Sequence, residues 1–423
     1  MTSAPGRLLR DSLSRLSNYR NLMYLLLFSA VIRFVWLDKP RNTLIFDEYY
    51  YVNAARVILG VPQSSSGGKI PYPNAVPGID PNPEHPPLAK LIVAFSIWLL
   101  GDNPYGWRLP SIIFGTLTVL FFYLIVENFN DRKLATLATL MLSLENLIFV
   151  HGRLATLDIS SLAFMLLSFH LYLSGKALLS GLSLALATLC KETGLYGLLV
   201  LVGYECFKSL KREQLKRLKL GLKKSRNLEI TILSYGLFLL VILFALDVFY
   251  GSFNNPLDHL SYICSYASQL TRPEGPVGIE SYPWQWLLNE VQISYLKVDV
   301  NIIVDGRVLG SRTTIEFMGA MNPFIIFSTI PAMAYMLNDW RRGRSGFSSF
   351  ILSWFTFTYL PYYPLAILLH RIMYIFYFLP TVPCVCAATA YTLSEGAPRS
   401  VVAGFLIAVI VGFASLFPFK QIP

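Results

Sequence analysis

Charged residues are scarce in this chain of 423 residues. Asp, Glu, Lys and Arg together make up 14% of it, whereas soluble globular domains carry about 25%. Hydrophobic residues make up 54%, and windows such as 372–394 and 400–419 contain no charge at all. Windows of roughly 20 apolar residues match the hydrocarbon thickness of a bilayer. The composition therefore excludes a soluble enzyme, a disordered scaffold and a secreted disulfide module, and it predicts a polytopic helical membrane protein.

Cysteines are also few, and their positions predict neither a disulfide framework nor a metal site. They are scattered through apolar segments at Cys190, Cys206, Cys264, Cys384 and Cys386. The net charge of +10 reflects an excess of basic residues. In a membrane protein these residues indicate the orientation of the spans before they indicate a nucleic-acid partner. The apolar run from Leu22 follows a basic, polar segment and is long enough to span, so we expect no cleavable signal peptide.

Eleven apolar segments are predicted to span the membrane as helices. They are 22–37, 108–126, 134–150, 157–173, 177–189, 194–207, 228–250, 321–337, 347–369, 372–393 and 401–417. A further apolar stretch at 88–100 is too short to span and is predicted as a juxtamembrane or re-entrant helix. The predicted fold class is thus an all-α polytopic membrane protein.

Basic residues predict the orientation of these spans, because cytoplasmic loops carry an excess of Lys and Arg. With the N-terminus in the cytoplasm, most basic residues fall on the cytoplasmic side, including the run from Lys208 to Arg226. The chain then divides into a cytoplasmic N-terminus (1–21), a transmembrane core (22–250), a long outer loop (251–320) and C-terminal transmembrane helices (321–423). The core contains another long outer loop (38–107). Both loops mix Pro, Gly, Tyr and Trp, so we expect them to be folded.

This orientation gathers the ionisable residues at the span ends on the outer side. They are Asp47, Glu48, Glu84, His85, Lys90, Arg108, Glu145, His151, Arg153, Asp158, Lys191, Glu192, His370 and Arg371. A carboxylate at a helix start can merely cap it, and a single basic residue can snorkel harmlessly to the interface. So many charges on one side instead predict a shared polar cavity, because charge at membrane depth is costly unless it is paired or functional. Excess cations suit a phosphate, apolar grooves suit a lipid tail and an exposed carboxylate supplies a general base. These features together suit a lipid-linked phosphosugar.

Short motifs spread along the chain resemble those of the protein O-mannosyltransferases. These are membrane enzymes of glycosyltransferase family 39 and the GT-C class that use dolichyl-phosphate mannose. The similar segments are FDE at 46–48, HPPLAK at 85–90, WRLPSIIFG at 107–115, ENLIFVHGRLATLD at 145–158, LATLCKETGLYG at 186–197, SYPWQWLL at 281–288, MNPFIIF at 321–327 and HRIMYIFYFLP at 370–380. The resemblance implies a GT-C fold. Departures are Glu192, where the family often has Trp, and a second outer loop too short for the carbohydrate-binding-like domain of eukaryotic members.

The resemblance further implies inverting transfer of mannose, or a related hexose, from a polyprenyl or dolichyl phosphate to Ser or Thr hydroxyls of proteins. It implies that Asp47 is the general base and that Glu48 orients the acceptor or Asp47. The implied donor-phosphate residues are His85, Arg108, Arg153, Lys191 and Arg371. The implied supporting residues are Glu84, Glu145, Asp158 and His370, and the residues bordering the acceptor are Trp284 and Trp286. No metal is required, although Glu84 with His85 is the one place where a divalent ion could bind.

Other functions stay open at this point. A GT-C transferase that modifies a lipid or glycan, like the lipid A aminoarabinose enzymes, shares the outer acidic residue and the PPL segment. A transporter or flippase predicts polar residues nearer mid-membrane, and a non-catalytic partner subunit would be expected to lack the acidic pair. The expected partners are a polyprenyl-phosphate sugar, an acceptor protein and membrane lipids, with a dimer left open. The expected location is the plasma membrane of a prokaryote, with the site facing outside.

Overall fold

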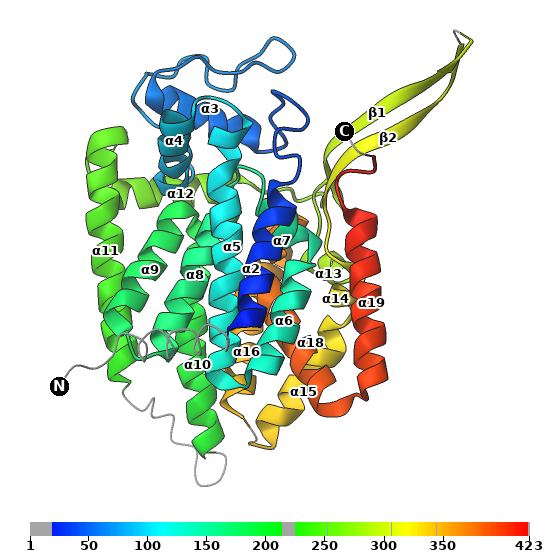
Figure 1. Cartoon of the computed structure of the whole chain (residues 1–423). Coiled ribbons are helices and arrows are strands. Elements are labelled where there is room, and N and C mark those ends of the chain that lie inside the picture. Colours follow the sequence, from blue (N-terminus) through cyan, green and yellow to red (C-terminus); the bar gives the residue numbers. More distant parts are fainter. Residues whose placement is uncertain (1–18, 214–224, 252, 306, 344, 422–423) are drawn as a thin grey trace, which may run out of the picture.

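The computed structural model describes residues 19–421, apart from 214–224 and the single positions 252, 306 and 344. The predicted cytoplasmic N-terminus up to residue 18 and the centre of the basic run after Lys208 lie outside this range. The rest of the chain folds as one helical bundle with short elements gathered at one end (Figure 1).

The bundle is built from helices that coincide with the predicted apolar segments. They are α2 (Arg20–Phe34), α5 (Pro104–Phe129), α6 (Arg132–Ser143), α7 (Asn146–His151), α8 (Asp158–Leu173), α9 (Ala177–Cys190), α10 (Tyr196–Glu213), α11 (Arg226–Tyr250), α14 (Pro323–Phe327), α15 (Thr329–Arg341), α16 (Gly346–Tyr359), α17 (Tyr362–Ile367), α18 (Val382–Gly396) and α19 (Arg399–Leu416). Short 3-10 helices precede α10 and α18, namely η1 (Glu192–Leu195) and η2 (Ile375–Phe378). The predicted span 134–150 holds two helices, α6 and α7, because Glu145 caps α7 and interrupts the span.

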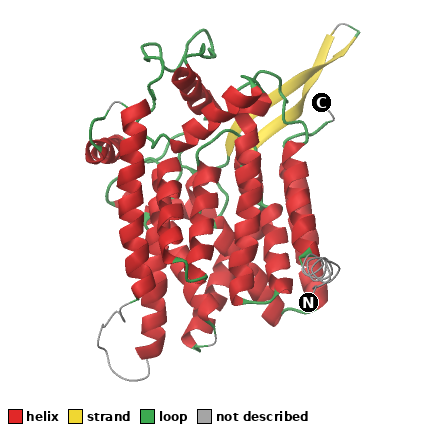
Figure 2. Ribbon diagram, turned by 60° about the vertical axis from the view of Figure 1, so that its left-hand side comes forward, coloured by secondary structure: helices red, strands yellow, loops and turns green. Residues whose placement is uncertain are grey.

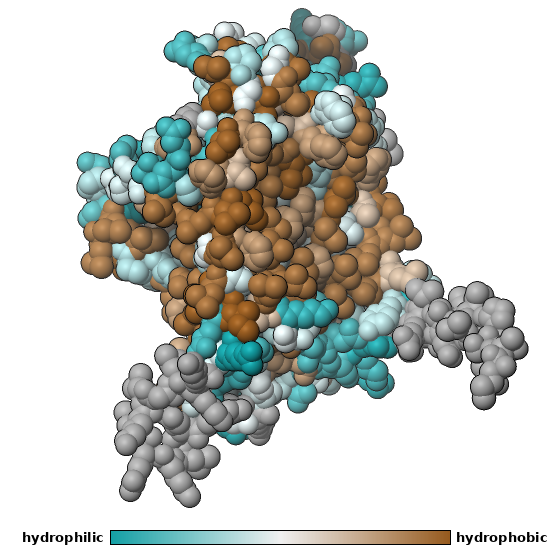
Figure 3. All heavy atoms as spheres, turned by 90° about the vertical axis from the view of Figure 1, so that its left-hand side faces the viewer, coloured by the Kyte–Doolittle hydropathy of each residue, from teal (hydrophilic) through white to brown (hydrophobic). Residues whose placement is uncertain are grey.

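The exposed surface of the bundle is that of an integral membrane protein. Among the described helices, α5, α11 and α19 are long and apolar enough to cross a membrane by themselves. The face shown in Figure 3 is brown in its middle and teal at both ends, so apolar side chains form a belt between two polar zones. The number of eleven spans stays a prediction, because the other described helices are shorter or less apolar.

Close helix packing in the bundle depends on small residues. At Gly181 in α9, an added Cβ would collide with the Ser234 side chain and with the backbone of α11. Small residues at helix interfaces let backbones approach closely where lipid offers no hydrophobic driving force. The Gly-Ser composition of α9 therefore explains why α9 and α11 lie side by side.

Four helices lie outside the predicted spans. Three of them, α3 (Glu48–Leu59), α4 (Leu88–Leu100) and α12 (Pro256–Gln269), lie at one end of the bundle, and the fourth is α13 (Pro283–Leu287). The short helix predicted at 88–100 is confirmed by α4. We refer to this end as the α3 end; it corresponds to the predicted outer side.

A β-hairpin projects obliquely from the same end (Figures 1 and 2). Strands β1 (Ile293–Val304) and β2 (Arg307–Gly319) pair antiparallel, with Ile293 opposite Gly319 and Lys297 opposite Glu316. The all-α prediction is therefore wrong for this segment. Alternating β-branched residues in VDVNIIV and TTIEF favour strands, and this signal was present in the sequence. The base of the hairpin is buried, and most of its outer half is exposed.

Candidate active site

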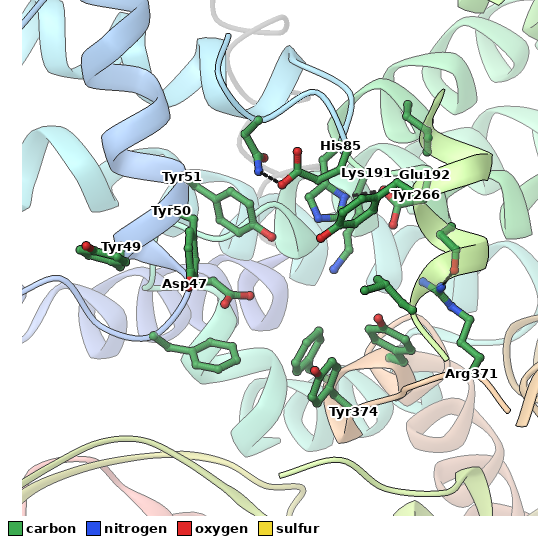
Figure 4. A pocket seen from close by; sticks show the side chains of 18 of the residues that line it. Asp47, Tyr49, Tyr50, Tyr51, His85, Lys191, Glu192, Tyr266, Arg371 and Tyr374 are labelled. Carbon is green, nitrogen blue, oxygen red and sulfur yellow. Dashed lines mark hydrogen bonds and ion pairs between the residues drawn. The ribbon is translucent and has the colours of Figure 1, made fainter. Parts of the chain in front are cut away.

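An open cavity of about 690 Å³ lies at the α3 end, a volume typical of small-molecule sites. Its walls come from the start of α3, the loop before α4, η1, α12 and the segment 371–377 (Figure 4). Charged and titratable side chains on these walls are Asp47, Glu84, His85, Lys191, Glu192 and Arg371. Five of these six residues were predicted site residues, and the fold brings them together from distant parts of the sequence.

Asp47 precedes α3, and its carboxylate points into the cavity (Figure 4). Among the described residues it has no hydrogen-bond partner for its side chain. The preceding Phe46 has a positive φ of 54° and stacks on Tyr295 with ring centroids 4.1 Å apart, which fixes the chain just before Asp47. Burial raises the pKa of Asp47 to about 6, an effect that the positive charge of Lys191 opposes. The carboxylate is still ionised at neutral pH and can accept a proton.

Glu48 faces away from the cavity and forms a buried ion pair with Arg108. The Arg108 Nε and Nη2 atoms donate to the two Glu48 oxygens at 2.8 and 2.7 Å. Glu48 also accepts from the amide of Ala155 at 2.8 Å, and Arg108 donates to the carbonyl of Leu37 at 2.8 Å. The pair thus ties the loop before Asp47 to α5 and to the chain before α8. The structure corrects the prediction for Arg108, because this guanidinium is fully engaged away from the cavity.

Arg153 also lies away from the cavity, although it was predicted to bind phosphate. Its guanidinium carbon lies 5.7, 5.4 and 5.1 Å from the ring centroids of Phe149, Phe317 and Phe419. It donates to the carbonyl of Val35 at 3.1 Å. Arg153 follows α7 in a turn, and this turn directs its side chain toward the base of the hairpin. In the structure, Arg153 therefore packs against aromatic rings instead of lining the cavity.

Lys191 reaches the cavity at the end of α9. Its Nζ donates to Asp158 Oδ1 at 2.6 Å. Burial opposes the charge, but Asp158 and Glu192 raise the pKa of Lys191 above its usual value, so the ammonium stays protonated. Asp158 also lies 3.7 Å from Nδ1 of His151, whose Nε2 is 2.9 Å from the Tyr295 hydroxyl. Asp158 thus holds Lys191 in place.

His85 forms a pair with Glu192, which the sequence analysis counted among the outer charges without giving it a role. The His85 Nδ1 and Glu192 Oε2 atoms are 2.9 Å apart. The backbone of His85 is fixed because the buried Lys90, paired with Asp80, donates to its carbonyl at 2.9 Å. The following proline, Pro86, stiffens the same segment. His85 is therefore held rigidly on the wall.

The loop that carries His85 is also held from α12. His259 Nε2 lies 2.9 Å from the carbonyl of Pro83, and its Nδ1 lies 2.8 Å from Asp247 in α11. Both ring nitrogens face acceptors. This buried bridge joins α11, α12 and the loop before α4, and the last two of these segments contribute residues to the cavity wall.

Arg371 and Glu84 line the cavity as predicted, whereas His370 does not. Arg371 donates to the carbonyl of Ala267, and Glu84 accepts a hydrogen bond from Asn82. His370 has a positive φ of 50°, and its exposed ring borders a small neighbouring pocket. Among the described residues, no three His, Cys, Asp or Glu side chains form a group suited to a metal ion.

The remaining predicted residues lie outside the cavity. Glu145 is buried, caps α7 and accepts from the amide of Asn322 at 3.1 Å, so its position is that of a helix cap. Trp286 is fully buried in the core. Trp284 is 39% exposed and stacks on Tyr282 with centroids 4.4 Å apart. The exposed Trp284 remains a candidate for acceptor contact, and the buried Trp286 does not.

Aromatic side chains line much of the cavity, and sequence reasoning missed them. They include Phe46, Tyr51, Tyr266, Tyr374, Phe376 and Tyr377. The Tyr-rich stretches at 49–51 and 374–377 were visible signals. Aromatic faces with polar hydroxyl tips suit a ligand that is partly apolar and partly polar, such as a sugar ring.

Sequence comparison identifies relatives over part of the chain. Residues 84–223 match the family model described as dolichyl-phosphate-mannose-protein mannosyltransferase. A polyprenol-phosphate-mannose–protein mannosyltransferase from Corynebacterium glutamicum is 32% identical over 140 residues, which are 31% of this chain and 25% of the relative. The protein of the same name from Mycolicibacterium smegmatis is 29% identical over 147 residues, or 33% and 26%. The match thus spans about a quarter of the length of these relatives, and it confirms the resemblance inferred from the motifs.

Solved structures share the fold over nearly the whole chain. The S. cerevisiae protein O-mannosyltransferase Pmt1-Pmt2 complex bound to its sugar donor matches with a TM-score of 0.65 and 13% identity, covering 95% of this chain and 90% of that one. ArnT from Cupriavidus metallidurans bound to undecaprenyl phosphate matches with a TM-score of 0.58 and 16% identity, covering 93% and 63%. At these identities the likeness establishes the fold, and the predicted GT-C fold is confirmed.

Proposed function

We propose, from the family match over residues 84–223 and the GT-C fold of the whole chain, that this protein is an inverting glycosyltransferase. It moves mannose, or a related hexose, from a polyprenyl phosphate to a Ser or Thr hydroxyl of a protein at the outer face of the membrane. One observation carries the proposal: an unpaired carboxylate, Asp47, shares an open cavity with His85, Lys191 and Arg371.

Asp47 acts as the general base in this proposal. The acceptor hydroxyl attacks the anomeric carbon on the face opposite the phosphate, and Asp47 takes the hydroxyl proton as the new C–O bond forms. The bond between the anomeric carbon and the phosphate oxygen breaks, and its electron pair stays on that oxygen. Glu48 acts indirectly, because its pairing with Arg108 fixes the start of α3 next to Asp47.

The cations stabilise the leaving phosphate. Negative charge develops on the phosphate as the sugar leaves, and preorganised positive groups in a confined site stabilise such charge. Lys191 is held in the cavity by Asp158, and Arg371 lies across the cavity from Asp47, near α12 (Figure 4). Arg108 and Arg153 have no part in this step. The phosphate already activates the sugar, so the proposed step uses no metal.

The test is transfer of radiolabelled mannose by the purified full chain. The donor is a polyprenyl-phosphate mannose, and the acceptor is a membrane-protein extract containing both proteins and lipids. We expect label in protein, and we expect Asp47→Asn to reduce transfer by about 10²–10⁴-fold, the usual contribution of a general base. Near-normal turnover by this variant would remove the role of Asp47.

The matched control is Asp305→Asn. Asp305 lies in the exposed turn of the hairpin at a positive φ of 48°, a conformation that Asn adopts as readily as Asp. This control should transfer at the rate of the unmodified chain. A second candidate is transfer to a lipid or glycan, which the outer acidic residue and the PPL segment leave open. Label in the lipid fraction alone would support that acceptor and contradict a protein acceptor.

A further inference from the structure

The pair formed by Glu192 and His85 is a feature of the cavity that the resemblance does not imply. Glu192 stands where the resembling family often has Trp, and it begins η1, 107 residues after His85. Its carboxylate approaches Nδ1 of the imidazole at 2.9 Å. Both side chains line the cavity, with His85 22% and Glu192 36% exposed. The pair is therefore accessible to a ligand.

The contact to Glu192 leaves one nitrogen of His85 for that ligand. A carboxylate beside Nδ1 keeps a proton on Nδ1, as in other carboxylate–histidine pairs. Nε2 has no partner within the described residues. When the ring carries its second proton, Nε2–H is a charged donor in the cavity. A charge-assisted hydrogen bond from such a donor to a phosphate oxygen is roughly twice as strong as a neutral one.

The position of the pair indicates which part of the substrate it serves. In Figure 4, His85, Lys191 and Glu192 lie together on one wall, and Asp47 lies on the opposite wall. In an inverting transfer the base and the leaving group act on opposite faces of the sugar ring. With Asp47 as the base, His85 is on the side of the leaving phosphate, next to Lys191.

Charges around the pair act in both directions on the imidazole. Charged and titratable groups that line the cavity with it include Asp47 and Tyr51 from the α3 region, Glu84 from its own loop, Lys191 and Glu192 from the α9–η1 junction, Tyr266 from α12, and Arg371 and Tyr377 from the segment 371–377. Lys191 disfavours an imidazolium, and the carboxylates favour it. Burial opposes ionisation of Glu192, yet His85 and Lys191 lower its pKa to about 2. The carboxylate in contact with His85 is thus ionised at all physiological pH values.

Building on the proposed function, we propose that Glu192 is a positioning residue that orients the His85 ring through Nδ1, so that the protonated ring donates from Nε2–H to the leaving phosphate. As the bond between the anomeric carbon and the phosphate oxygen breaks, its electron pair moves onto that oxygen, and the hydrogen bond from Nε2–H strengthens. The proton of the acceptor hydroxyl goes to Asp47. Glu192 itself does not touch the substrate.

The experiment measures binding of a short-chain polyprenyl monophosphate to the full chain in detergent at a series of pH values. Glu192→Gln keeps the size of the side chain but removes the negative charge beside the His85 ring, so the charged donor is less stabilised in the variant. We expect the variant to bind as tightly as the unmodified chain at about pH 5.5 and about tenfold more weakly at about pH 7.5, the loss of one charged hydrogen bond. The phosphate of the ligand titrates in the same way with every variant. A difference between two curves of dissociation constant against pH therefore arises from the protein.

A second variant, His85→Gln, tests the same inference even if Glu192→Gln fails to fold. It removes the titrating group, so the ratio of its dissociation constant to that of the unmodified chain should fall toward one as the pH rises. Adding Glu192→Gln to it should change nothing further. A constant ratio for either single variant across the pH range would overturn the role of Glu192 and leave the proposed function intact. Absence of binding by the unmodified chain would overturn the proposed function, and this inference with it.

Discussion

At the scale of single residues, the fold separates two neighbouring carboxylates into different tasks. Adjacent residues on a helix point about 100° apart, so the sequence predicted that Asp47 and Glu48 would differ. It could not identify Arg108 as the partner of Glu48, because the pair joins elements 60 residues apart. For the same reason the predicted cation set was too large. Side-chain directions after a turn, as at Arg153, depend on tertiary packing.

The pKa of Asp47 predicts how activity depends on pH. Because that pKa is raised to about 6, the carboxylate takes up a proton as the pH falls through this value and can no longer act as a base. We expect kcat/KM for the donor to fall about tenfold per pH unit below pH 6. The measurement is initial rates with the mannosyl phosphodiester, which does not itself titrate in this range. A kcat/KM that stays constant down to about pH 4.5 would contradict the prediction.

Removing the charge of Arg108 and removing the charge of Lys191 should have different effects on ligand binding. Arg108→Met leaves Glu48 buried and unpaired, which costs about 3–5 kcal/mol of folding stability. Lys191→Met also strands a buried carboxylate, that of Asp158, but in addition it removes a charged donor to the phosphate and should weaken polyprenyl-phosphate binding by about 10- to 100-fold. Thermal unfolding and ligand titration separate the two effects. The exposed Arg341→Met serves as a control for both, and weaker ligand binding by folded Arg108→Met would restore Arg108 to the phosphate site.

At the scale of elements, hydropathy located the helices but not what lies between them. The helix α4 matches its predicted range because an apolar run flanked by Pro and Gly has clear ends. The hairpin was missed because it lies in a segment of mixed composition, where a span search finds no signal. Its base nevertheless contributes to the site, since Tyr295 of β1 contacts both Phe46 and His151.

Loss of the Tyr295 ring should therefore impair catalysis more than donor binding. Tyr295→Leu removes the stack on Phe46 that fixes the chain before Asp47, and small displacements of catalytic groups are costly. We expect kcat to fall about tenfold with little change in polyprenyl-phosphate affinity. Replacing residues 299–313 by a short turn should alter neither, because these residues do not line the cavity. Equal kinetics for Tyr295→Leu and the unmodified chain would show that the hairpin base does not position Asp47.

At the scale of the whole molecule, composition alone was sufficient to predict a membrane protein, and the order of the motifs was sufficient to predict the GT-C fold. The site could be predicted only as a set of charges on one side of the bilayer. Its aromatic lining and the contact between His85 and Glu192 depend on how α3, η1 and the segment 371–377 meet.

Orientation can be tested with the free cysteines. Cys264 of α12 is exposed at the α3 end, whereas Cys190, Cys384 and Cys386 are buried. If the cavity faces outside, a membrane-impermeant maleimide should label Cys264 in intact cells, and Cys264→Ser should abolish that labelling. Labelling of Cys264 only in inside-out vesicles would place the cavity in the cytoplasm.

The exposed end of the hairpin is a suitable place to insert extra sequence. Beyond the Lys297–Glu316 pair the two strands bond chiefly to each other, and neither lines the cavity. Extra sequence in their connecting turn would be accommodated without repacking the helices. An affinity tag placed there would immobilise the folded chain on a sensor with the mouth of the cavity unobstructed, and the same turn would accept a fused domain without shortening any helix.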